Sequence, residues 1–60
     1  MGVREDLVAE VLKSAGRPLT AAVIGRLTHT PVRTVKATLH RLEADGLATR
    51  NGVGSWRAAS

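Results

Sequence analysis

One segment of this 60-residue chain carries the signals for both ends of a helix. Thr30 has a side chain that can cap a helix, and Pro31 suits the first turn because no amide hydrogen is needed there. Gly46 favours a helix end, because glycine readily takes the left-handed conformation. Between these signals, four apolar residues recur at steps of three and four: Val32, Val35, Leu39 and Leu42. The pattern predicts a helix over about 31–45 with one apolar face.

The face of this helix opposite the apolar residues is slim and basic. With about 100° between successive residues, it is centred on Ala37. Its surroundings are polar, basic or small: Arg33, Thr34, Arg41 and Ala44, with Lys36 and His40 on one shoulder. We expect this face to point outward while the apolar face covers a core.

A first helix is predicted over 3–15, where apolar residues also recur at helical spacing. These residues are Val3, Leu7, Val8, Val11 and Leu12. Acidic residues come early in this segment and Lys13 late, as the helix dipole prefers. Gly16 and Pro18 then end the helix, and Leu19 is expected in a short extended segment.

A second, shorter helix is predicted over 21–27, with Thr20 as its cap. Its expected buried stripe consists of Val23, Ile24 and Leu27. Gly25 lies inside this helix, where glycine costs about 1 kcal/mol against alanine. We interpret it as a point where another helix packs closely on the backbone; simple tolerance of a glycine is the alternative.

After Gly46 the pattern changes from helical to alternating. Asn51-Gly52 is a strong signal for a two-residue hairpin turn in which both residues have positive φ. The predicted strands are 47–50 and 53–58, with Arg50 opposite Val53 and Leu47 opposite Trp56. Leu47 and Trp56 would then lie on the same side of the hairpin and cover the helices together. The side chains on the other side of the hairpin would be those of Ala48, Arg50, Ser55 and Arg57.

Length and composition predict a single domain over 1–60 and argue against several classes of protein. The chain has no cysteine, so a disulfide framework and a thiolate metal site are excluded and a cytoplasmic setting is favoured. It has no apolar run long enough to cross a bilayer and no signal-peptide pattern at its start. No spacing of histidine, carboxylate and serine predicts a catalytic or metal site, and no glycine-rich phosphate-binding pattern occurs between a strand and a helix. We therefore expect no enzyme activity, no cofactor and no small-molecule site.

The formal net charge of +4 is distributed unevenly along the chain. Residues 1–15 carry a slight negative balance, whereas residues 16–60 carry seven arginines and lysines against two acidic residues. This asymmetry favours a polyanionic partner.

Three helices, a short strand and a terminal hairpin resemble the winged helix-turn-helix domain, a mostly-α α+β fold. The segments that carry the resemblance are 18–21, 28–35 and 42–47. The pattern is similar to the DNA-binding domains of MarR-, IclR- and Lrp-type bacterial regulators. Two residues depart from it: Gly25 stands where the family usually has alanine, and His29 where it usually has glycine. His29 must therefore accept a left-handed backbone, which histidine does more readily than most residues.

The resemblance implies sequence-specific binding of double-stranded DNA and regulation of transcription, with the helix over 31–45 in the major groove. Ala37 would let the backbone approach the bases, and Arg33 is the first candidate for base contact, followed by Lys36, His40 and Arg41. Further candidates are contacts to the DNA backbone: Thr30 and Thr34 on the helix, and Arg50, Asn51, Gly52 and Arg57 on the wing.

Other interpretations of the same sequence remain open. The basic face can be a solvated surface, and the winged-helix fold also serves as a protein-docking module that never meets nucleic acid. Left-handed DNA is less favoured: Z-DNA-binding domains are similar, but Lys36 and His40 stand where they use asparagine and tyrosine. A lone domain of this size would bind DNA weakly, so a homodimer or a larger parent protein is expected. The expected location is the cytoplasm, in association with a bacterial nucleoid if the protein binds DNA.

Overall fold

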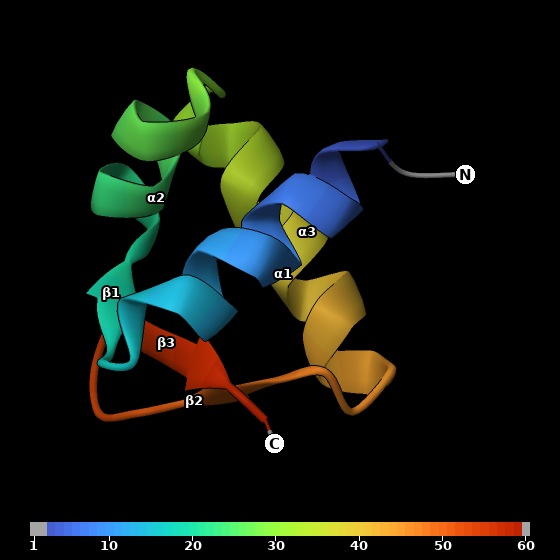
Figure 1. Ribbon diagram of the computed structural model, residues 1–60, viewed down its shortest axis with the longest axis vertical. Coiled ribbons are helices and arrows are strands. Elements are labelled where there is room, and N and C mark those ends of the chain that lie inside the picture. Colours follow the sequence, from blue (N-terminus) through green and yellow to red (C-terminus); the bar gives the residue numbers. More distant parts are fainter. Residues whose placement is uncertain (1–2, 60) are drawn as a thin grey trace.

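The computed structural model describes residues 3–59, in which three helices precede a β-hairpin (Figure 1). The elements are α1 (Val3–Ala15), β1 (Leu19–Thr20), α2 (Ala21–Thr28), α3 (Val32–Ala44), β2 (Ala48–Arg50) and β3 (Ser55–Ala58). The strands form one antiparallel sheet in the order β1-β3-β2. The predicted fold class, a mostly-α α+β fold with a C-terminal hairpin, is confirmed. None of the helices within 3–59 combines the length and the apolar character needed to cross a membrane.

Helix α1 has the predicted bounds and the predicted end. Gly16 follows it with φ of 64°, the left-handed conformation that terminates a helix. Val8 and Leu12 are fully buried, whereas Leu7 is 44% exposed, so the apolar face is narrower than the sequence indicated. The side chain of Val3 lies outside what the structure describes.

Helix α2 begins as predicted, because the Thr20 side chain accepts a hydrogen bond from the Val23 amide at 3.2 Å. Its predicted buried stripe is wrong in two positions out of three: Val23 is 41% and Leu27 59% exposed. The buried face consists of Ala21, Ile24, Gly25 and Thr28. These are mostly small residues, which allow close approach, and the Thr28 hydroxyl is satisfied internally by donating to the Ile24 carbonyl at 2.8 Å.

The turn between α2 and α3 passes tightly over Gly25. A Cβ atom at this position would lie 2.7 Å from the backbone oxygen of Thr30 and 3.7 Å from methyl groups of Val32 and Val35. The interpretation of Gly25 as a close-packing point is therefore confirmed, although the nearest group belongs to the turn. His29 adopts φ 53° and ψ 44°, the left-handed conformation expected for it.

The start of α3 differs from the prediction by one residue. Pro31 is the cap residue, and Thr30 precedes it with a buried side chain whose hydroxyl donates to the Thr28 carbonyl at 3.1 Å. Thr30 therefore does not cap the helix, because it lies one residue before the cap position. The predicted stop is confirmed: Gly46 has φ of 77°, and the amides of Gly46 and Leu47 donate to the Glu43 and Leu42 carbonyls.

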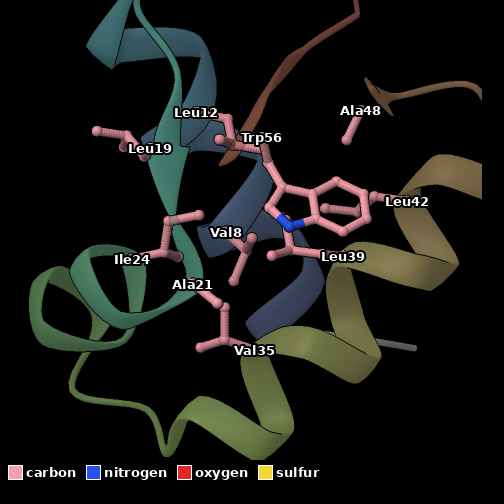
Figure 2. Close-up of a cluster of buried hydrophobic side chains, with 10 residues drawn as sticks. All are labelled: Val8, Leu12, Leu19, Ala21, Ile24, Val35, Leu39, Leu42, Ala48 and Trp56. Carbon is pink, nitrogen blue, oxygen red and sulfur yellow. The ribbon is translucent and has the colours of Figure 1, made fainter. Parts of the chain in front are cut away.

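The core lies between the three helices and the inner face of the sheet (Figure 2). Trp56 is at its centre and only 6% exposed, with Leu39 and Leu42 of α3 and Val8 of α1 around it. Val32, predicted in the core, is instead 41% exposed. Thr38 is buried on this side of α3, because its hydroxyl donates to the Thr34 carbonyl at 2.9 Å.

The hairpin has a different turn and register from those predicted. Arg50 pairs with Trp56 and Ala48 with Ala58, and the Asn51 amide donates to the Ser55 carbonyl at 2.9 Å. The left-handed residues are Gly52 and Gly54 rather than Asn51 and Gly52, so the loop is wider.

A register shift by an odd number of residues moves side chains to the opposite face of the ribbon. Ala48 therefore lies with Trp56 in the core and is 1% exposed, whereas Leu47 is 52% exposed. The predicted pairing of Leu47 with Trp56 is wrong. Arg50 shares the Trp56 side, and Arg57 pairs with Thr49 on the other face.

Candidate nucleic-acid interface

The outer face of α3 is exposed among the residues that the structure describes, as predicted. Arg33, Lys36, Ala37, His40 and Arg41 are all exposed, and Thr34 is half-buried. The opposite side of the helix is fixed in the core by Val35, Thr38, Leu39 and Leu42. We call the six outward residues from Arg33 to Arg41 the α3 face.

A groove of about 240 Å³ runs along one side of the α3 face, next to the start of α1. Its lining residues are Glu5, Thr34, Ala37, Thr38 and Arg41. Within it, Arg41 Nη1 lies 2.9 Å from Glu5 Oε2 in a hydrogen-bonded ion pair. The hydrogen bond to Glu5 and then the charge of Glu5 raise the pKa of Arg41, so this side chain stays cationic at every working pH.

A second groove, of about 230 Å³, separates the other side of the α3 face from the hairpin. Lys36 and His40 line it from α3, and Arg50 and Trp56 from the strands. The guanidinium carbon of Arg50 lies 5.1 Å from the centroid of the Trp56 ring, and the His40 ring meets Trp56 edge-on at 5.6 Å. In both contacts an exposed polar side chain packs against the buried ring of Trp56. Because Arg50 and Trp56 belong to the hairpin and His40 to α3, these contacts give the hairpin a defined position beside α3.

Glu43 is an acidic side chain at the same groove. Its carboxylate lies 3.6 Å from Arg50 Nε and 3.9 Å from His40 Nδ1. Ion pairs this exposed contribute little to stability, and they can exchange for other anions. By contrast, no carboxylate in residues 5–59 lies within ion-pair distance of Arg33 or Lys36. These two cations are the ones on the α3 face that a phosphate or base can reach without competition.

The remaining predicted site residues divide into three places. Asn51 and Gly52 are exposed in the hairpin loop, directly after Arg50. Thr30 is buried in the turn, away from the α3 face. Arg57 is exposed on the face of the sheet opposite Trp56, so it lies apart from Arg50 and the α3 face.

Glu5 is the residue at this surface that the sequence did not indicate. It lies 36 positions from Arg41 in the chain, and its place in the first turn of α1 is already explained by the helix dipole. The contact depends on how α1 crosses α3, and no local pattern predicts that crossing.

The chain matches no protein-family model, no curated protein and no solved structure. The geometry itself defines a small α+β domain with a basic, outward helix face between two shallow grooves. No group of three or more potential metal ligands comes together in the part of the chain that the structure describes.

Proposed function

We propose that this protein binds double-stranded DNA by placing the α3 face in the major groove, in the manner of the winged helix-turn-helix domains that its sequence resembles. The observation that carries the proposal is the exposed α3 face, with a small residue at its centre and two uncompensated cations, Arg33 and Lys36. Sequence-specific binding of this kind would serve the regulation of transcription.

The shape of the α3 face suits a groove about 12 Å wide. Ala37 keeps the centre of the face low, so that the helix backbone can approach the base edges. Arg33 lies in the first turn, the part of a recognition helix that usually contacts bases, and a guanidinium can bond both acceptors of a guanine. Among the described residues α3 has no side-chain cap, which leaves its first amides able to bind a phosphate.

We infer that the hairpin contacts the DNA backbone beside the major groove. Arg50 is held against Trp56 on the same side of the molecule as Lys36 and His40, and the loop with Asn51 and Gly52 continues from it. We assign these three hairpin residues to the wing contact. Arg57 points from the other face of the sheet and is not included.

The proposal is tested by selecting duplexes from a random-sequence pool and then titrating the enriched duplex against variants. Arg33→Ala should weaken binding by about fivefold or more, since a bidentate base contact contributes about 1–3 kcal/mol. Arg33→Lys is the matched control for charge: it should keep the salt dependence of the wild type and still lose the preference for the enriched sequence. Equal affinity of the wild type and Arg33→Ala would rule out base readout by this residue.

A second candidate function is protein docking without nucleic acid. It is favoured by the exposed apolar side chains of Leu7, Val23 and Leu27, the last of which lines a groove with Val11 and Ala15. The same titration distinguishes the two functions. Failure of the wild type to bind or enrich any duplex at low salt would favour docking.

A further inference from the structure

The end of α1 lies beside β3 (Figure 1). A further groove lies there, on another part of the molecule from the α3 face. Its volume is about 190 Å³, and half of its lining residues are cations. The lining residues are Leu12, Lys13, Gly16, Arg17, Arg57 and Ala58. We call it the α1–β3 groove.

The three cations of this groove come from two parts of the chain. Lys13 is in the last turn of α1, Arg17 follows the helix end, and Arg57 belongs to β3. A cation in the last turn complements the helix dipole, which accounts for Lys13 by itself. It does not account for Arg57, which the fold brings to the same groove from 44 positions further along the chain.

No carboxylate in residues 5–59 lies within ion-pair distance of any of these cations. Three like charges around one small groove repel one another, and a bound anion removes that cost. Lysine and arginine clusters are the usual partners of phosphate oxygens, which accept several charge-assisted hydrogen bonds at once. The groove is smaller than the roughly 300 Å³ at which sites for drug-sized ligands begin, so it suits a compact anion.

The α1–β3 groove is separate from the α3 face. Arg57 points from the opposite side of the sheet to Trp56 and Arg50, which border the α3 face. Lys13 lies eight residues along α1 from Glu5, at the far end of the helix from the Glu5–Arg41 ion pair. At about 1.5 Å per residue, this separation is about 12 Å along the helix axis.

We propose that the α1–β3 groove is a second site for phosphate groups, held by Lys13, Arg17 and Arg57. The proposal goes beyond DNA binding by the α3 face and does not depend on it. If the α1–β3 groove binds the backbone of a second duplex while the α3 face binds the first, one molecule bridges two DNA segments. If the groove binds a free oligophosphate, it is a separate anion site.

The first test is a titration of isotope-labelled protein with pyrophosphate, in which NMR spectra record the chemical shifts of the backbone amides. We expect saturable shifts in residues 12–17 and 57–58 that sodium chloride at the same ionic strength does not reproduce. Saturable shifts confined to the α3 face, or none, would overturn the proposal.

Two matched variants separate the site from overall charge. Lys13→Gln/Arg17→Gln/Arg57→Gln should weaken pyrophosphate binding by tenfold or more, because it removes every cation of the groove. Arg33→Gln/Lys36→Gln/Arg41→Gln removes the same charge from the α3 face and should leave that affinity within about twofold. If both variants lose affinity equally, the binding reflects net charge and the site is wrong. Single variants at the exposed Lys13 and Arg57 give the same comparison should a triple variant not fold.

The source of the phosphate is decided by mixing two duplexes that carry donor and acceptor dyes. Energy transfer with the wild type, lost in the groove variant while each duplex still binds, identifies the ligand as a second DNA backbone. Pyrophosphate binding without energy transfer, by a protein that still binds each duplex on its own, identifies a free oligophosphate. Failure of DNA binding to the α3 face would leave the pyrophosphate result unchanged, so the two proposals fail separately.

Discussion

His29 is the described non-glycine residue with a left-handed backbone, and it closes the turn between α2 and α3. Its amide reaches the Arg26 carbonyl at 3.4 Å, and the next amide, of Thr30, reaches the Gly25 carbonyl at 2.9 Å. A side chain in this conformation costs about 1–2 kcal/mol, which glycine avoids. The turn therefore stores strain at one exposed position.

Replacing this residue by glycine should stabilise the protein. We expect His29→Gly to raise the free energy of unfolding by up to about 1 kcal/mol, because the relief of strain exceeds the extra freedom glycine has in the unfolded chain. Urea unfolding followed by circular dichroism measures the change. His29→Ala is the control: it keeps the strain and should give no gain. A loss of stability in His29→Gly would mean that the imidazole makes a stabilising contact.

Gly25 should be intolerant of even one added carbon. The Cβ of Gly25→Ala would lie 2.7 Å from the Thr30 backbone oxygen, and this oxygen belongs to the turn and cannot rotate away. We expect a loss of about 1–3 kcal/mol, despite the better helix propensity of alanine. Thermal unfolding measures this loss of stability. Ser14→Ala, at an exposed position of α1, is the control and should change the stability little. A stability equal to that of the wild type would show that the turn can move outward at little cost.

Local signals in the sequence predicted helix ends correctly where one residue determines the backbone conformation at or near its own position. Gly16, Thr20 and Gly46 mark helix ends as predicted, because glycine conformation and a hydroxyl cap depend on the neighbouring few residues. The prediction for Thr30 failed because α3 begins one residue later, with Pro31 as its cap residue, and this leaves the Thr30 hydroxyl in the turn, where it donates to the Thr28 carbonyl. Where the helix begins depends on the geometry of this turn and cannot be predicted from the sequence alone.

At the scale of elements, Trp56 connects the hairpin to α1, α3 and β1. It pairs with Leu19 of β1 and Arg50 of β2, and its ring fills the space between Leu39, Leu42 and Val8 (Figure 2). The hairpin register follows from this burial. The sequence could not predict it, because Asn51-Gly52 favours a tight turn locally while pairing with the distant β1 determines which residue of β3 points inward.

Truncation of this tryptophan should unfold the protein or bring it close to unfolding. A large aromatic residue replaced by alanine in a core costs about 3–5 kcal/mol, and a domain of this size has little stability to spare. We expect Trp56→Ala to lose its cooperative thermal transition, measured by circular dichroism. Trp56→Phe should keep the transition at a lower midpoint. Retention of wild-type stability in Trp56→Ala would contradict the central place of the ring in the core.

At the scale of the whole molecule, the fold rearranges charges that the sequence keeps apart. The sequence correctly predicts which side of α3 is exposed, because a period of 3.6 residues fixes it. It cannot predict that Glu5 comes to Arg41, that Glu43 lies between His40 and Arg50, or that Arg57 lines a groove with Lys13 on another part of the molecule. Three of the candidate DNA contacts, His40, Arg41 and Arg50, thus have carboxylate partners before any DNA arrives.

Glu5 has a double effect on the proposed DNA surface. Its carboxylate fixes the Arg41 guanidinium beside Ala37, and it also places a negative charge in the groove next to the α3 face. Glu5 is partly shielded, with 24% of its side chain exposed, whereas Arg41 is 70% exposed. A phosphate that approaches Arg41 must therefore compete with a carboxylate already in place.

Removal of that carboxylate should strengthen DNA binding. We expect Glu5→Gln to bind the enriched duplex several-fold more tightly at low salt, because Arg41 becomes free to pair with a phosphate. One added phosphate contact also steepens the dependence of log affinity on log salt by about 0.9. Titrations at three salt concentrations measure both effects. Glu10→Gln, an equal change of charge on the exposed middle of α1, is the control and should leave the salt dependence unchanged. If both variants gain affinity equally and with the same salt dependence, only net charge is at work, and Arg41 does not contact the DNA.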